Sequence, residues 1–429
     1  MTTDTFTDQD LPQGVWRFTR GWIVFMVITG AVVLFGAFAY SRQLSEGLIT
    51  TGLRDLGSVQ GAPWGLYVAF DVYFAGASFA GITVAALIRL FDIERLKSVA
   101  RMAEVLTIVS LLLAGLAIIA DLGQPLRGLF NLLRFGRPQS PFFGTYSMVI
   151  AGYLFSSLIF LYLTGRADAA KMAEKPSTLR WYFQLWSSGY RDSPDQRKRD
   201  RTTSFWLAIA ILPLLVVAHS SLGFVFGLQV GRPGWFGTLQ APAFVALAGV
   251  SGVGHLIVLA AIVRRTVRGG KRITLDAFAW LGRLLMMLVF VYLYFTIVEM
   301  FTTIYQADVA EQGLTQALLT GRYAWIFWGS IASLALPALG LAYMAVRKSW
   351  KVSWTVAAGA VVNIGAIGKR FLIVVPSETH AQLIPYGTGS YSPSWIEYSV
   401  ILGLMALGAL LIGLFIKTFP IMELEEADL

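Results

Sequence analysis

The sequence predicts an all-α integral membrane protein with ten transmembrane helices, and three observations support this fold class. Of the 429 residues, 56% are hydrophobic and only 14% are charged, against about 45–50% and 25% in soluble domains. Ten apolar runs reach the roughly 20 residues that a helix needs to cross a bilayer. Lys and Arg gather in alternate connections between these runs, as in multi-pass proteins. An ordinary soluble enzyme and a disordered chain are therefore excluded.

Turn residues and charges mark the ends of the predicted spans. The second span opens at Pro63-Trp64-Gly65, the third ends in Asp121-Leu122-Gly123-Gln124-Pro125, and the sixth opens at Ala241-Pro242. Gly and Pro stop a helix at such positions. The first span is too long for a cleavable signal peptide and follows an arm with acidic residues. The ten spans cover residues 21–40, 64–90, 102–121, 142–164, 204–228, 242–262, 278–305, 324–346, 353–375 and 395–419.

The distribution of Lys and Arg predicts the orientation of the chain. Of the 34 such residues, 24 lie on the side of the termini, seven on the opposite side and three within spans. Short loops rich in these residues stay cytoplasmic, so both termini are predicted to be cytoplasmic in a bacterial inner membrane. The net charge of +9 thus reflects topology, and no nucleic-acid partner is expected.

The predicted spans fall into two four-helix bundles. Spans two and six open with Ala-Pro and end before Arg, which suggests a parallel internal repeat of spans two to five in six to nine. The longest basic connection is interpreted as a solvated cytoplasmic loop, with partner docking as the alternative. The expected units are an arm (1–20), the first span with its outer loop (21–63), a first bundle (64–228, with the loop 165–203), a second bundle (229–375) and a last span with its tail (376–429).

Asp71 and His219 are the strongest candidates for a functional site. Ionisable side chains in hydrocarbon cost about 2.5–3.5 kcal/mol each, so each one suggests a function and a partner. Asp71 lies about 10 Å below the outer end of its span in an aromatic run, and His219 lies at nearly the same depth. Either could instead be a hydrogen-bonded core residue. His255 lies roughly 6 Å deeper than His219, and His380 falls in an outer loop.

Other ionisable residues invite structural interpretations. Asp121 ends its helix, where a carboxylate opposes the helix dipole, so we expect compensation by Arg127. Glu299 and Lys369 lie about six residues from the outer surface and are predicted to form a buried ion pair. Arg283 is close enough to the cytoplasmic face to reach water.

Metal chemistry is restricted by composition. The chain has no Cys and three His, which removes thiolate metal sites, iron–sulfur ligation and a thiol nucleophile and leaves room for at most one haem. A haem between His219 and His255 would need offset helices, so none is expected. Redox metal centres must come from partner proteins.

Several motifs occur in a familiar order. They are Pro63-Trp64-Gly65, Asp121-Leu122-Gly123 with Pro125, Ser140-Pro141, His219, Gly231-Arg232-Pro233-Gly234-Trp235, Tyr294 with Glu299 and Tyr305, Phe327-Trp328, Asn363, Arg370-Phe371-Leu372-Ile373-Val374-Val375-Pro376, and Phe419-Pro420. Over nearly its whole length the chain resembles the NrfD, or polysulfide reductase membrane-subunit, family. It is most similar to the ten-span members of hydrogenase-type, sulfite-reduction-associated and alternative complex III-type assemblies. One departure is Lys369, where the family pattern suggests an acidic residue.

The resemblance implies a haem-free subunit that exchanges electrons and protons with menaquinone or ubiquinone near the outer face. Its partners would be a ferredoxin-like iron–sulfur subunit and, beyond it, a multihaem cytochrome c or molybdopterin-type subunit. Asp71 and His219 would serve the reaction. Trp64, Tyr67, Tyr146 and Asp121 would line the quinone pocket, and Glu299, Arg283 and Lys369 would form a proton path.

A positioned base favours hydroquinone oxidation, and a carboxylate inside the membrane is such a base. The outer loops 122–139 and 229–240, rich in Arg, Gly and aromatic residues, would receive the partner. Two alternatives remain open. One is a secondary transporter of a small anion that uses Arg232, Arg283 or Lys369, with Pro213 and Pro337 as helix breaks. The other is a passive membrane anchor.

Overall fold

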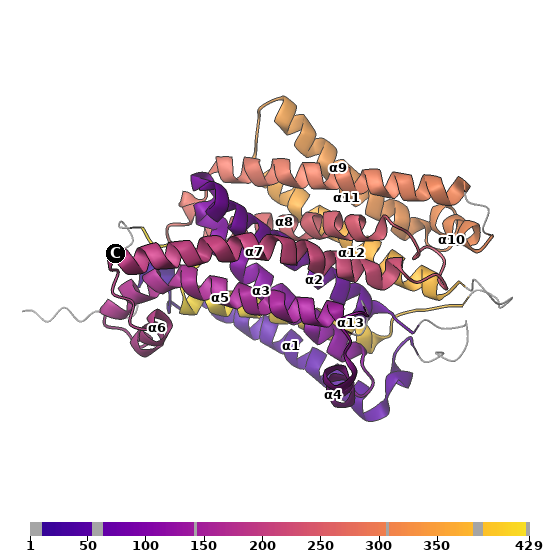
Figure 1. The fold of residues 1–429 in the computed structure, drawn as a ribbon, viewed down its shortest axis with the longest axis horizontal. Helices are drawn as coiled ribbons and strands as arrows, with labels where there is room; N and C mark the ends of the chain where they lie inside the picture. Colours follow the sequence, from indigo (N-terminus) through magenta and orange to yellow (C-terminus); the bar gives the residue numbers. More distant parts are fainter. Residues whose placement is uncertain (1–10, 54–62, 141–143, 306–308, 381–388, 426–429) are drawn as a thin grey trace, which may run out of the picture.

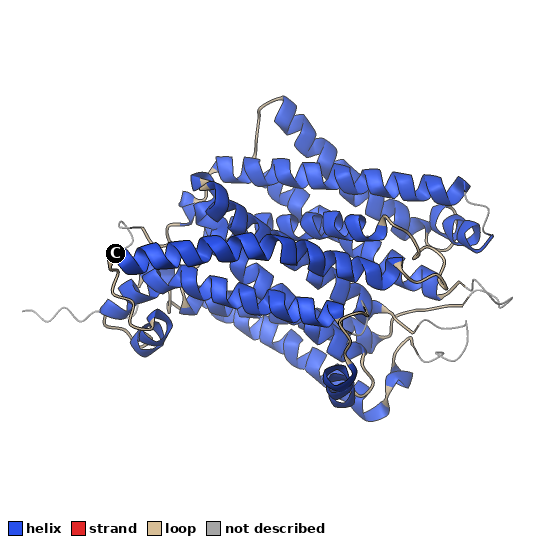
Figure 2. Ribbon diagram, viewed as in Figure 1, coloured by secondary structure: helices blue, strands red, loops and turns tan. Residues whose placement is uncertain are grey.

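The computed structural model describes residues 11–53, 63–140, 144–305, 309–380 and 389–425. These parts of the chain form helices joined by short connections (Figure 2). The principal helices are α1 (Arg20–Glu46), α2 (Leu66–Phe91), α3 (Lys97–Asp121), α4 (Pro125–Phe135), α5 (Thr145–Glu174), α6 (Arg180–Ser187), α7 (Pro194–Gly227), α8 (Gln240–Thr266), α9 (Leu275–Tyr305), α10 (Val309–Leu319), α11 (Ala324–Val346), α12 (Val352–Glu378) and α13 (Trp395–Thr418).

Ten of these helices are long and apolar enough to span a membrane: α1, α2, α3, α5, α7, α8, α9, α11, α12 and α13. They correspond in order to the ten predicted spans and run along the long axis of the molecule (Figure 1). The prediction of an all-α membrane protein with ten spans is confirmed. The predicted start of the fourth span, at Phe142, lies outside the described residues.

The spanning helices form two bundles that close in the same order. In the first, α2 packs on α3, α3 on α5, α5 on α7 and α7 on α2; in the second, α8 packs on α9, α9 on α11, α11 on α12 and α12 on α8. The bundles meet where α2 packs on α8, flanked by the contacts of α7 with α8 and of α12 with α2. This shared order is what a parallel repeat would produce. Helices α1 and α13 pack together outside the bundles.

Glycine allows several of these helices to come close together. A Cβ atom added at Gly36 in α1 would lie 2.9 Å from Cα of Gly403 in α13. A Cβ atom added at Gly254 in α8 would lie 2.7 Å from the carbonyl oxygen of Gly359 in α12. Because lipid provides no hydrophobic drive for helices to associate, close contact through small residues holds such pairs together.

Three short helices lie beside the spans. The region 165–203, expected as a loop, contains the end of α5, all of α6 and the start of α7, which Ser193 caps and Pro194 opens. Helix α4 follows α3 on the side opposite the termini. Figure 1 shows α4 end-on, whereas the spans run across the view. It therefore runs perpendicular to the spans. Helix α10 lies between α9 and α11.

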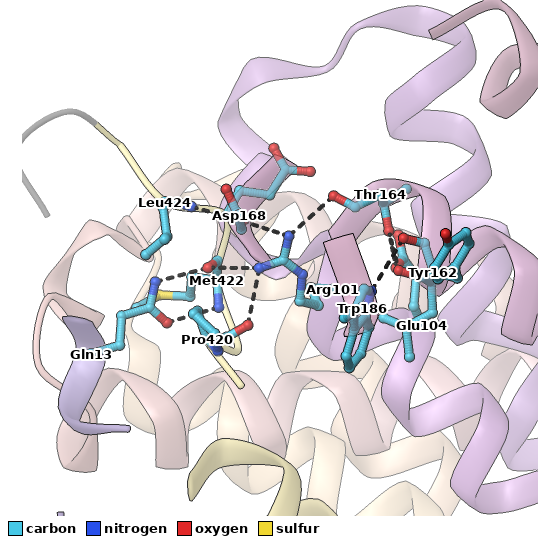
Figure 3. A network of polar contacts seen from close by, with 12 residues as sticks. Gln13, Arg101, Glu104, Tyr162, Thr164, Asp168, Trp186, Pro420, Met422 and Leu424 are labelled. Atoms are coloured by element: carbon cyan, nitrogen blue, oxygen red, sulfur yellow. Dashed lines mark hydrogen bonds and ion pairs between the residues drawn. The ribbon is translucent and has the colours of Figure 1, made fainter. Parts of the chain in front are cut away.

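A buried ionic network ties the tail to the first bundle, on the side of the termini (Figure 3). Arg101 of α3 donates hydrogen bonds to Oδ2 of Asp168 in α5 at 2.7 Å and to the carbonyl oxygens of Pro420 and Met422 at 3.0 and 3.1 Å. Gln13 holds Met422 through two further bonds, from its Nε2 and to its Oε1. The arm and the tail therefore lie together, on one side of the molecule.

Candidate functional site

The end of the first bundle opposite the termini gathers buried acidic and phenolic side chains. Asp71, on the second turn of α2, is 2% exposed, and the hydroxyl of Tyr146 in α5 donates a hydrogen bond to its Oδ1 at 3.3 Å. Asp121, the last residue of α3, is close enough to influence Asp71 electrostatically. The structure thus brings together Asp71, Tyr146 and Asp121, which come from three helices and which the family resemblance implies for one pocket.

Tyr67 connects this group to α1. Its hydroxyl donates to Oε1 of Gln43 at 2.6 Å, and Nε2 of Gln43 donates to the carbonyl oxygen of Ala120 at 2.7 Å. Tyr67 also experiences the negative charges of Glu397 and Asp121. It therefore lies one turn before Asp71, on the wall of α2 that faces α1 and α3.

A third carboxylate lies beside the start of α2. Glu397, at the start of α13, accepts hydrogen bonds from the backbone N–H groups of Gly52 and Ser394 and from the hydroxyl of Tyr391. The Tyr391 hydroxyl in turn accepts the N–H of Leu66, which opens α2. Burial and the neighbouring Glu397 raise the pKa of Tyr391 above the usual value of a phenol. These contacts fix the start of α2, and with it the position of Asp71.

No cation joins Asp71 or Asp121 in an ion pair within the described part of the chain. Oδ1 of Asp121 is buried without a hydrogen-bond partner there, and the expected compensation by Arg127 is not found, because Arg127 lies on the exposed side of α4. Glu397 and Glu378 both act on Asp121 as like charges. Two acids of the first bundle and one of α13 therefore lie near one another at the end of the molecule opposite the termini, and we call this group the acidic cluster: Asp71, Asp121 and Glu397.

His219 faces backbone rather than the acidic cluster. Its Nδ1 lies 2.9 Å from the carbonyl oxygen of Leu215, and its Nε2 lies 2.9 Å from the carbonyl oxygen of Ala75, one turn beyond Asp71 on α2. A neutral imidazole has one N–H and can donate to only one of these oxygens at a time. The ring ties α7 to α2 just below the cluster.

Trp64 belongs to an aromatic group between the bundles. Its ring stacks on that of Trp235, with 5.6 Å between centroids, and meets Phe226 edge-on. The indole nitrogen of Trp235 donates to the carbonyl oxygen of Ile373 in α12. This group lies at the end of the interface between α2 and the second bundle that is opposite the termini.

A separate polar cavity of about 60 Å³ lies inside the second bundle, lined by Glu299, Lys369 and Arg370 among others. Oε1 of Glu299 accepts a hydrogen bond from Nε2 of Gln240 at 3.1 Å. Within the described residues no direct ion pair links Glu299 to Lys369, whose ammonium lies over the rings of Phe327 and Tyr292 at 5.1 and 5.9 Å. The predicted pair is replaced by a longer-range attraction. Such a cavity has room for a few waters.

The other predicted cations lie apart from this cavity. Arg283 is exposed on α9, sixteen residues from Glu299, with its guanidinium over the ring of Trp350. Arg232 forms an ion pair with Glu378 at 3.5 Å. The three cations considered for a transported anion, Arg232, Arg283 and Lys369, therefore do not converge.

Arg370 and Tyr73 are buried polar residues that the sequence did not single out. Arg370 donates to the carbonyl oxygen of Phe244 at 3.2 Å and places its guanidinium over that ring. The hydroxyl of Tyr73 donates to Oδ1 of Asn363 at 3.0 Å and lies 3.4 Å from Nε2 of His255. Both sit where α2, α8 and α12 meet. In the sequence, the position of Arg370 beside Lys369, in a span with few polar residues, is the feature that could have identified it as a site residue.

The comparisons with known proteins cover most of the chain. The model of the family described as polysulphide reductase, NrfD, matches residues 55–381. A putative membrane subunit of a dimethyl sulfoxide reductase of Halobacterium salinarum is 30% identical, over 94% of this chain and 91% of that protein. An Hdr-like menaquinol oxidoreductase integral membrane subunit of Archaeoglobus fulgidus is 24% identical over 92% of each chain. The integral membrane subunit of a menaquinone reductase of Nitratidesulfovibrio vulgaris is also 24% identical, over 94% and 93%.

Proposed function

Since the chain belongs to the NrfD polysulphide reductase family, we propose that it is the quinone-interacting membrane subunit of a respiratory oxidoreductase complex. The relatives named as menaquinol and menaquinone oxidoreductase subunits support a menaquinone. The observation that carries the proposal is the acidic cluster, a group of carboxyls without a paired cation in the described residues, at the end of the molecule opposite the termini.

Within this site Asp71 is the proton acceptor. Oxidation of a hydroquinone releases two protons and two electrons, and a base held beside a phenol oxygen speeds the proton transfer. The Asp71 carboxylate has one hydrogen-bond partner within the described residues, the Tyr146 hydroxyl. Tyr146 can relay a proton because a hydroxyl both donates and accepts. In this proposal Tyr67, Trp64 and Asp121 line the quinone pocket, and His219 holds α2 in place beside it.

The electrons leave to an iron–sulfur partner on the outer side. The chain contains no Cys, so it supplies no thiolate ligand for a cluster of its own. Helix α4 borders the site and presents an apolar stripe in which Leu126 and Leu133 are 83% and 87% exposed. This stripe and the loop 229–240 form the surface for that partner, with a multihaem cytochrome c or molybdopterin-type subunit beyond it.

Proton movement across the membrane is assigned to the second bundle. Glu299 and Lys369 line its polar cavity together with Gln240 and Arg370, and waters there would carry protons between them. Arg283 lies at the far end of the same helix, toward the side of the termini. In this proposal quinone chemistry and proton transfer occupy different bundles.

Photolabelling tests the location of the quinone. The purified complex is illuminated with an azido-menaquinone, and labelled peptides are mapped by mass spectrometry. We expect label on residues 66–91, 97–121 and 145–174, displaced by menaquinone and reduced at least threefold in Asp71→Asn. The matched control is Glu299→Gln, which also neutralises a buried acid but in the second bundle. Label confined to 275–305 and 352–378, or label that menaquinone does not displace, would refute the proposed site.

A further inference from the structure

A large groove opens in the half of the molecule that carries the termini. Its volume is about 900 Å³, and it lies between α1 and α13 on one side and α2, α3 and α8 on the other. Phe25, Phe74, Leu106 and Leu259 are among the side chains on its walls. The proposed quinone chemistry uses none of these residues.

The length of the groove matches one leaflet of a bilayer. Along α13 it extends from Met405 to Lys417 and along α8 from His255 to Thr266, which correspond to about 18 and 16 Å of helix. The hydrocarbon of one leaflet is about half of the 30 Å bilayer core. A groove of this length accommodates extended acyl chains from mid-membrane to the surface.

The mouth of the groove is basic. Arg17, Arg268 and Lys417 line it, and the lining residues that the structure describes include no Asp or Glu. Arg17 acts on Lys417 as a like charge, and within the described residues none of the three cations has an ion-pair partner. Helix α1 also begins here, at Arg20, and the free N–H groups of a helix start favour an anion.

The deep end of the groove offers little to a polar headgroup. The Tyr73 hydroxyl already donates to Oδ1 of Asn363, and Nδ1 of His255 faces the carbonyl oxygen of Ser251 at 2.8 Å. A quinone carbonyl, which needs a hydrogen-bond donor, would have to displace one of these bonds. An acyl chain would not, because it needs only apolar contact.

We propose that this groove binds an anionic phospholipid of the leaflet on the side of the termini, with its acyl chains along α8 and α13 and its phosphate beside Arg17, Arg268 and Lys417. Helix α13 packs on α1 and α3 but not closely on α8. The lipid fills the space between α13 and α8. It thereby links the peripheral pair of helices to the two bundles.

Lipid-dependent thermal stability of the purified complex tests the proposal. The chain is delipidated in detergent, and its unfolding temperature is followed while phosphatidylglycerol or phosphatidylcholine is added. We expect a saturable rise with phosphatidylglycerol at least twice that with phosphatidylcholine. In the variant R17Q/R268Q/K417Q this difference disappears. The control R264Q/R265Q removes two cations of α8 on the same side that do not line the groove, and it retains the difference.

A second variant tests the groove itself. Ala409 lines the groove on α13, and Ala409→Trp places a large ring in the space for the acyl chains. We expect lipid analysis of the purified protein to show at least threefold less bound phosphatidylglycerol and unchanged menaquinone. Retention of the lipid in both variants would overturn the proposal. So would loss of menaquinone in place of lipid from Ala409→Trp, since the groove would then hold the quinone.

Discussion

Arg101 and Asp71 are both buried charged residues of the first bundle, but their surroundings differ. Arg101, 1% exposed on the side of the termini, donates to one carboxylate and to three backbone carbonyl oxygens. Asp71, at the opposite end, accepts one hydrogen bond within the described residues, from Tyr146. A buried charge held by several hydrogen bonds stabilises the structure, because moving it would leave those buried partners unsatisfied. A carboxylate with one hydroxyl partner can exchange a proton.

The largest expected effect is on turnover. Asp71→Asn keeps the shape and the hydrogen bond from Tyr146 but removes the base, so quinol oxidation by the complex should fall at least about 100-fold, the lower range for loss of a general base. The rate is measured with a water-soluble menaquinol analogue and an artificial electron acceptor. Glu299→Gln should leave this rate within about threefold. Equal losses in both variants would contradict the proposal that quinone chemistry and proton transfer occupy different bundles.

On the side of the termini, replacing an aspartate with asparagine should lower stability rather than turnover. Asp168→Asn removes the carboxylate that is bonded to Arg101. Glu104 and Glu423 still attract the guanidinium, so the loss should be at most about 3–5 kcal/mol, the cost of breaking a buried ion pair. Unfolding in mixed micelles with increasing dodecyl sulfate measures the loss, and Asp276→Asn, an exposed acid on the same side, is the control. Per folded molecule, quinol oxidation should be unchanged. A fall in the turnover of the folded protein would contradict the assignment of Asp168 to stability alone.

Removal of single hydroxyl groups on α5 sharpens the contrast. Tyr146→Phe removes the hydrogen bond to Asp71, and a bond to a charged group is worth about 1.5–3 kcal/mol, so turnover should fall about tenfold or more. Tyr153→Phe is the matched control, because its hydroxyl donates to the backbone oxygen of Ser78 at 2.9 Å. It should lower stability slightly and leave turnover unchanged. The reverse outcome would remove Tyr146 from the proposed relay.

The sequence predicted the spans well because length and apolarity alone determine them. It also placed Asp71 and His219 at nearly the same depth, since depth from a span end is readable from residue numbers. The grouping of Asp71 with Tyr146 came from the family resemblance. Depth does not tell which face of a helix a residue occupies, so it could not show that His219 turns both nitrogens toward backbone oxygens.

Contacts between distant side chains were harder to predict. Glu299 accepts a hydrogen bond from Gln240, and Lys369 lies over aromatic rings. The packing of neighbouring helices determines the position of the charged end of a long side chain, and this packing cannot be read from one span. Arg101 was counted only as a topological charge, since nothing local points to Asp168, 67 residues away. Helix α4 was recognisable from the spacing of Leu126, Leu129 and Leu133, but a search for runs of membrane length passes over an eleven-residue helix.

The smallest expected effect has the opposite sign to that of Asp168→Asn. Asp121 ends α3, where a carboxylate opposes the helix dipole, and Glu397 and Glu378 add like charge. Asp121→Asn should therefore raise the free energy of unfolding, by about 0.3–1 kcal/mol from the dipole, in the same dodecyl sulfate titration at neutral pH. If Asp121 shapes the quinone site, the more stable variant should also oxidise quinol more slowly. Destabilisation by Asp121→Asn would mean that a partner compensates this carboxylate, and the acidic cluster would then resemble the ionic network around Arg101.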